Sequence, residues 1–155
     1  MVNDRPELFL PLKIFPEAGD EVLLSPVYLL PVNIMERGLL TRVKLTTKTV
    51  LVDASSGRAT SCDGRVKLCA APELPAAARE LPVKLSPAEA EAVAETAASP
   101  EEARGWRRGL RSAELFFLDS GRALAWRAYI VRGSLLIDTF TGESRDTSSV
   151  IDIFF

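Results

Sequence analysis

The chain has 155 residues, of which 47% are hydrophobic and 26% charged, and it contains no histidine. This composition is typical of a packed globular protein; the missing histidine excludes Ser-His-Asp and Cys-His catalysis and removes the commonest transition-metal ligand. The net charge of −2, from 19 basic and 21 acidic residues, gives the whole chain no general attraction to nucleic acid or anionic membranes.

The beginning of the chain predicts no export signal. Its first apolar run, Leu8 to Phe15, is short and is interrupted by Pro11 and Lys13, whereas a signal peptide needs a basic start and an uninterrupted apolar stretch. No apolar stretch reaches the length of a membrane span. We therefore expect a cytoplasmic protein without membrane association, or an exported one if a leader has been removed.

Residues 1–69 predict a β-rich first unit, because aliphatic and β-branched residues alternate with turn formers and no helical period occurs. Leu8–Phe15 is expected as an edge strand. Glu21–Glu36 is an extended stretch whose two prolines should bend it or leave it partly unpaired. Leu39–Asp53 continues as one long strand.

The two cysteines, Cys62 and Cys69, flank an Asp63-Gly64 pair that is typical of a hairpin turn. In that register Cys62 faces Arg65 and not Cys69. We therefore expect two free, buried thiols and no disulfide, and two thiols are too few for a zinc site.

Residues 70–85 form a proline-rich linker, after which the clearest local signal of the chain predicts a helix. In Ser86–Glu89, serine is the N-cap, proline occupies the first helical position, and glutamate follows three residues after the cap. This pattern predicts a helix over residues 87–98. A second serine-proline start predicts a short helix over residues 100–107.

Residues 86–155 therefore form the second unit, in which these helices are followed by a period of two. Strands are expected at Leu110–Leu118, Ala123–Val131 and Ser134–Asp138, with a last apolar strand at Val150–Phe154. The sequence predicts an α+β protein. Its mainly antiparallel sheet is covered on one face by the helices.

The two units share a short repeat. Thr49–Arg58 matches Ser134–Glu143, and both segments read as three apolar residues, Asp, two variable residues, Ser or Thr, and Gly. Upstream, the turn Arg37-Gly38 matches Arg132-Gly133, so the first copy has the longer hairpin. Such a repeat is typical of duplicated supersecondary units.

This pattern resembles the end of PepSY-like domains, where a strand finishes in a Val-Asp-Ala-x-Thr-Gly-Glu turn. The resemblance is strongest over Ser86–Glu143, and residues 25–60 resemble a second, divergent copy with Arg58 where the family usually has an acid. It implies a fold of two PepSY-like repeats. Members of the family are associated with peptidase propeptides, so the resemblance also implies a regulator or inhibitor of a peptidase.

The two repeated aspartates are interpreted as structural turn anchors. Asp53 and Asp138 each end a strand and can accept hydrogen bonds from the following backbone N–H groups, while Gly57 and Gly142 take the left-handed conformation of the turn. The alternative is a carboxylate-based enzyme that uses these residues or Asp119. It fails if the carboxylates lie at separate turn tips with no shared cleft.

Two further groups of residues are candidate interaction sites. The first is a basic cluster around a tryptophan, which either offsets the dipole of a helix C-terminus or binds a ligand or partner. The second is the C-terminal apolar strand, which completes the chain's own sheet, pairs across a dimer or captures a partner's strand. The residues are Arg104, Trp106, Arg107, Arg108 and Arg111 in the cluster, and Ile151, Ile153, Phe154 and Phe155 in the strand.

These features together predict a small, non-catalytic binding or protein-interaction module. No Gly-rich phosphate loop, metal-spaced ligand set or nucleophile elbow occurs, so no cofactor and no metal are expected. The expected partner is a protein or a second copy of the chain at the sheet edges, not nucleic acid. A peptidase regulator and a carboxylate-based enzyme are the alternatives.

Overall fold

The computed structural model describes residues 5–38, 43–74, 78–97 and 110–146, which form nine strands and one helix. In chain order the elements are β1 (Leu8–Phe9), β2 (Glu21–Gly38), β3 (Lys44–Asp53), β4 (Ala59–Asp63), β5 (Arg79–Glu80), α1 (Pro87–Ala97), β6 (Leu110–Phe117), β7 (Ala123–Arg132), β8 (Leu135–Asp138) and β9 (Ser144–Asp146). No helix within these residues is long and apolar enough to cross a membrane.

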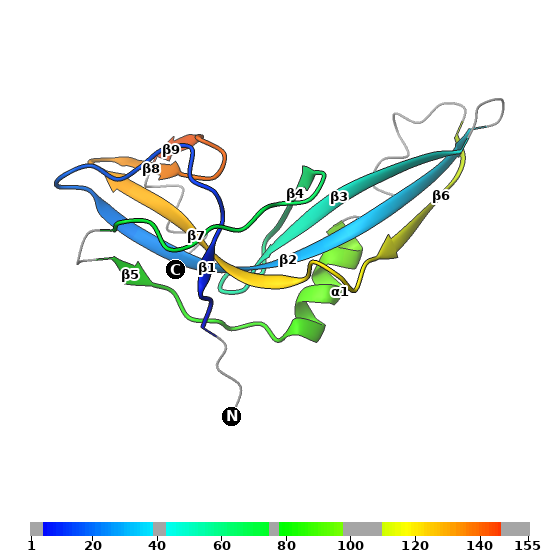
Figure 1. The fold of residues 1–155 in the computed structure, drawn as a ribbon, viewed down its shortest axis with the longest axis horizontal. Helices are drawn as coiled ribbons and strands as arrows, with labels where there is room; N and C mark the ends of the chain where they lie inside the picture. The colour runs from blue at the N-terminus through cyan, green and yellow to red at the C-terminus, as the bar shows by residue number, and fades with distance from the viewer. Residues whose placement is uncertain (1–4, 39–42, 75–77, 98–109, 147–155) are drawn as a thin grey trace.

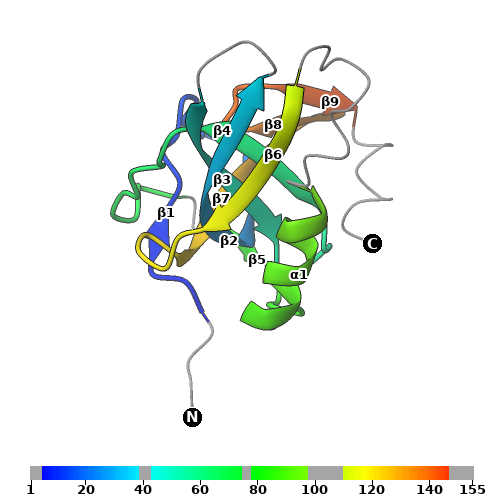
Figure 2. The same cartoon turned by 90° about the vertical axis from the view of Figure 1, so that its right-hand side faces the viewer.

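All nine strands belong to one sheet, and its mainly antiparallel pairing agrees with the prediction of an α+β protein. Its main path runs β4-β3-β2-β7-β8-β9, with β1 added to β7 and β5 and β6 added to β2. The sheet curls into a half-barrel, visible from the side in Figure 1 and from the end in Figure 2. Strands from residues 1–69 and from residues 86–155 hydrogen-bond to each other, because β2 and β7 are antiparallel neighbours at its centre.

The long strand β2 contains two prolines at positions where it changes neighbours. Pro26 lies between the residues paired with β5 and those paired with β3, and Pro31 lies between the residues paired with β7 and those paired with β6. A proline has no N–H to donate, so it fits where the adjacent strand is interrupted. Both carbonyls are still used, since Ala54 N–H donates to Pro26 and Leu118 N–H to Pro31.

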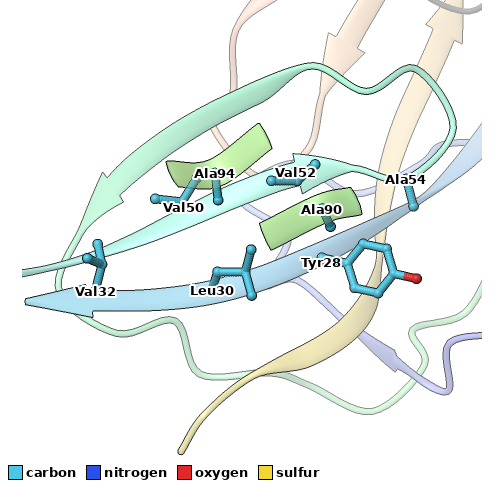
Figure 3. Close-up of a cluster of buried hydrophobic side chains, with 8 residues drawn as sticks. All are labelled: Tyr28, Leu30, Val32, Val50, Val52, Ala54, Ala90 and Ala94. Carbon is cyan, nitrogen blue, oxygen red and sulfur yellow. The ribbon is translucent and has the colours of Figure 1, made fainter. Parts of the chain in front are cut away.

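Helix α1 covers one face of the sheet, over β2 and β3 (Figure 2). Its predicted start is confirmed: Ser86 Oγ accepts from Glu89 N–H at 3.2 Å, and a Glu89 carboxylate oxygen accepts from Ser86 N–H at 3.2 Å. Ala90 and Ala94 are fully buried against Val50, Val52 and their neighbours on the sheet (Figure 3). Small side chains at these positions let the helix backbone approach the strands closely.

The predicted hairpin between Cys62 and Cys69 is wrong. Cys62 lies on β4 opposite Thr49, and Cys69 forms an isolated bridge with Phe9. The chain does not fold back at Asp63-Gly64: Gly64 N–H donates to the carbonyl of Thr47 at 2.9 Å, which continues the pairing with β3, and residues 64–68 form no strand. Both thiols are free, as expected, but Cys62 is half-buried and Cys69 is exposed.

Several other boundaries differ from the predictions. The strand expected over Leu8–Phe15 is reduced to β1, and the expected linker, residues 70–85, contributes β5 to the sheet. Strand β9 was not predicted, since its three residues are all polar. The short helix expected over residues 100–107 and the strand expected at Val150–Phe154 lie outside the described residues.

Candidate functional site

The turn after β3 is built around the carboxylate of Asp53. Its Oδ1 atom accepts hydrogen bonds from Ser55 N–H at 2.9 Å and Ser56 N–H at 2.8 Å, and its backbone carbonyl accepts from Gly57 N–H at 2.8 Å. Gly57 has a φ of +80°, in the region that glycine adopts without a Cβ penalty. The second carboxylate oxygen, Oδ2, accepts from Ser25 Oγ at 2.5 Å.

The turn after β8 is built in the same way around Asp138. Its Oδ1 atom accepts from Phe140 N–H at 2.9 Å and Thr141 N–H at 3.5 Å, and its carbonyl accepts from Gly142 N–H at 2.7 Å. Gly142 has a φ of +82°. Here the second carboxylate oxygen is bound by the guanidinium of Arg127 through Nη2.

The two groups that face the carboxylates, Ser25 and Arg127, are direct partners in the β2–β7 pairing. Ser25 is fully buried and Arg127 is 9% exposed. The guanidinium lies 5.8 Å from the ring centroid of Tyr129 and 5.5 Å from that of Phe140. Its Nε atom is buried and has no hydrogen-bond partner, so one donor of this cation is unused in the described structure.

The electrostatic environment fixes the ionisation of these groups. Burial acts to lower the pKa of Arg127, but Tyr129, the hydrogen bond to Asp138 and the charges of Asp138 and Asp53 outweigh it and raise the pKa. Burial raises the pKa of Tyr129 well above its usual range. At neutral pH the arginine is therefore charged and the phenol neutral.

Each turn accepts a backbone hydrogen bond from a short segment elsewhere in the chain, and the two segments have similar sequences. Residues 10–14 read Leu-Pro-Leu-Lys-Ile and residues 81–85 read Leu-Pro-Val-Lys-Leu. Lys13 N–H donates to the carbonyl of Thr139 at 2.6 Å, and Lys84 N–H donates to the carbonyl of Ala54 at 2.8 Å. Each segment thus holds the turn that belongs to the other half of the chain.

Both turns open onto one pocket of about 100 Å³. It is lined by residues of β3, β4, β7, β8 and β9 and of the two turns: Leu51, Asp53, Ser56, Arg58, Thr60, Arg127, Tyr129, Leu136, Asp138, Glu143 and Arg145. Since β4 and β9 stand at opposite ends of the main strand path, the curl of the sheet brings its two ends around the same space (Figure 1).

The structure therefore brings two predicted turn anchors together. Asp53 and Asp138 hold their own turns and also line the same cleft. A shared cleft is the geometry that the carboxylate-based enzyme requires. Asp119 does not line this cleft. Their oxygens are largely committed, because each carboxylate accepts two backbone N–H groups and one side-chain donor. Such carboxylates are poorly placed to take a proton from a substrate.

The other candidate residues fall elsewhere. Arg111 lies on β6, and the remaining members of the basic cluster, Arg104, Trp106, Arg107 and Arg108, lie outside the described residues. The same holds for the C-terminal strand residues Ile151, Ile153, Phe154 and Phe155.

The sequence interpretation missed Ser25 and Arg127 as site residues. Each is a polar interruption in the middle of an apolar strand, in Leu-Leu-Ser-Pro-Val and Ala-Trp-Arg-Ala-Tyr respectively. A polar or charged residue at such a position needs a partner when it is buried. The need for a buried partner is therefore the sequence signal that could have identified Ser25 and Arg127 as site residues.

The charged residues at the pocket rim are more exposed than those inside the pocket. Arg58, Glu143 and Arg145 are exposed and form no ion pair with any residue that the structure describes. Within the described ranges, no three Asp, Glu or Cys side chains are grouped so as to hold a metal ion.

The chain matches no protein-family model, no curated protein and no solved structure. The residues of the pocket are therefore the basis for any statement about function.

Proposed function

We propose that this protein is a non-catalytic binding module and that its ligand site is the pocket between the Asp53 and Asp138 turns. The observation that carries the proposal is the state of Arg127, a buried cation held in a pocket by a carboxylate and two aromatic rings. Buried charges of this kind are costly to maintain, and a ligand site is a common reason for keeping them.

We also propose that the fold consists of two related PepSY-like halves. It is supported by the matching hydrogen bonds of the two turns and by the two Leu-Pro-x-Lys segments, which directly follow β1 and β5, the strands that pair in parallel with β7 and β2. In this reading the pocket forms where the halves meet.

Binding rather than catalysis is favoured by the side chains present. The two shared carboxylates already accept hydrogen bonds that hold their turns, the tyrosine is a neutral phenol, and an arginine stays protonated at neutral pH. These groups can orient a polar ligand, but none of them is a suitable general base; the remaining carboxylate, Glu143, is exposed at the pocket rim.

The experiment is an amide NMR titration of the full chain with a panel of small acids, amines, amino acids and sugars. We expect at least one compound to shift the amides of Ser56, Thr141 and Tyr129 in a saturable way. Thr60→Trp should abolish the shifts, since Thr60 lines the pocket. Ser61→Trp is the matched control, because Ser61 is the exposed neighbour on the other face of β4.

A panel that leaves these amides unmoved, or a response that survives in the Thr60→Trp variant, would contradict the proposed site. Conversion of a bound compound during the titration, lost in an Asp53→Asn variant, would instead support the carboxylate enzyme.

A further inference from the structure

The pocket carries cations from three separate elements. Arg58 directly precedes β4, Arg127 lies on β7 and Arg145 lies on β9. Because β4 and β9 are the opposite ends of the main strand path, two of these arginines approach the same space from opposite sides. Arginine presents a planar set of donors that matches a carboxylate group in two parallel hydrogen bonds.

The formal charges of the pocket balance, because Arg58, Arg127 and Arg145 are matched by three carboxylates, but most of the carboxylate oxygens are already occupied. The oxygens of Asp53 and Asp138 are engaged by their turns, by Ser25 and by Arg127. Among the described residues, the charged groups left with free hydrogen-bonding capacity are the guanidiniums of Arg58 and Arg145 and the carboxylate of Glu143, so free charged donors outnumber free charged acceptors.

The remaining walls are apolar and set the size of a ligand. Leu51 is 3% exposed and Leu136 is 4% exposed, and both line the pocket. A volume of about 100 Å³ corresponds to about three waters at their liquid volume of about 30 Å³ each. A ligand of that size combines a charged group with a short hydrocarbon body.

We infer that the ligand is a small organic acid, whose carboxylate is bound by Arg58 and Arg145 and whose apolar body lies against Leu51 and Leu136. This inference rests on the proposed function and specifies its ligand class. Arg127 remains paired with Asp138 and forms part of the pocket wall.

The test uses three probes of equal length and different charge: butanoate, butanamide and butylamine. Each is titrated into the full chain and followed by the amide signals of Ser56 and Thr141. We expect saturable shifts with butanoate and an affinity at least about tenfold weaker for the other two, since a charge-assisted hydrogen bond is lost. Inorganic phosphate is titrated in parallel.

Arg58→Gln and Arg145→Gln should each weaken butanoate binding about tenfold. Arg65→Gln is the matched control: it removes the same charge from another exposed arginine, one that does not line this pocket, and should leave the affinity unchanged.

Failure of this inference can be distinguished from failure of the proposed function. Amide shifts with butylamine or butanamide, but not with butanoate, would contradict an acidic ligand. They would still support a binding site in this pocket. Equal affinity for phosphate and butanoate would overturn the role of the apolar walls. Equal loss of affinity in the Arg65→Gln variant would show that general charge, and not this pocket, attracts the acid.

Discussion

The turn after β3 and the turn after β8 have the same backbone, but the carboxylate of the first meets a hydroxyl group and that of the second meets a guanidinium. Ser25 leaves the charge of Asp53 uncompensated, whereas Arg127 compensates that of Asp138. Two sites that are alike in geometry therefore differ in electrostatics. Backbone hydrogen bonds therefore shape both turns alike, while one pair of facing residues, Ser25 and Arg127, decides whether the carboxylate of each turn is compensated.

The largest expected difference between the turns comes from removing these two facing groups. Arg127→Met leaves Asp138 as a largely buried carboxylate without its cation and should cost about 3 kcal/mol of unfolding free energy. Ser25→Ala removes one hydrogen bond to Asp53 and should cost about 1.5 kcal/mol. Urea denaturation followed by circular dichroism measures both.

A double variant separates charge from packing. Asp138→Asn added to Arg127→Met keeps an oxygen for the turn but removes the unpaired charge, so it should recover at least about 1 kcal/mol. Equal costs for the two single variants, or no recovery in the double variant, would show that the guanidinium does not distinguish the turns electrostatically.

A smaller effect should be equal in the two turns. Gly57→Ala and Gly142→Ala both place a Cβ at a φ near +80°, and the new carbon meets only an ordinary contact, with Leu85 or Ile14 at 3.9 Å. The strain alone should cost about 1 kcal/mol at each site. Asparagine, which tolerates this conformation better, should cost less at both.

Thermal unfolding of the four glycine variants tests this equality. A cost confined to one turn would mean that the two backbones are not equivalent in solution.

The smallest effect depends on pH and concerns the N-terminal end of β2, which pairs with β7. Asp20, just before β2, accepts from Arg132 Nε at 3.0 Å and Nη2 at 2.8 Å and from Glu17 N–H at 2.8 Å. The hydrogen bonds from Arg132 and Glu17 lower the pKa of Asp20 to about 2, from 3.8. The carboxylate therefore stabilises the fold above pH 4, and this contribution is lost as the pH falls from about 4 to about 2.

Hydrogen exchange between pH 5 and pH 2 should show this loss near the junction of β2 and β7 and leave the β2–β3 pairing protected. In an Asp20→Asn variant the acid-dependent change should be absent. Its persistence in that variant would assign the effect to another carboxylate.

The elements that depend on local signals were predictable from the sequence. Helix α1 follows from the reciprocal cap of Ser86 and Glu89, which needs no partner from elsewhere in the chain. The α+β class and most strands of the second unit follow from the change of hydrophobic period. The Cys62–Cys69 hairpin failed because pairing with β3, a tertiary contact, determined where β4 lies.

The pocket was not predictable in the same way. The sequence identified the two aspartates but treated them as separate turns, since their proximity depends on the register that places Ser25 opposite Arg127. No local pattern encodes that register. The Leu-Pro-x-Lys segments were also missed, although they are visible as a second repeat once the turns they support are known.

These two segments have a consequence for how the chain folds. Residues 10–14 complete the turn at Thr139, and residues 81–85 complete the turn at Ala54, so each half lacks a piece until the other is present. Contacts this distant in sequence slow folding, because a long loop must close before they form. During synthesis, β1 therefore cannot pair with the sheet until β7 and the second turn have emerged from the ribosome.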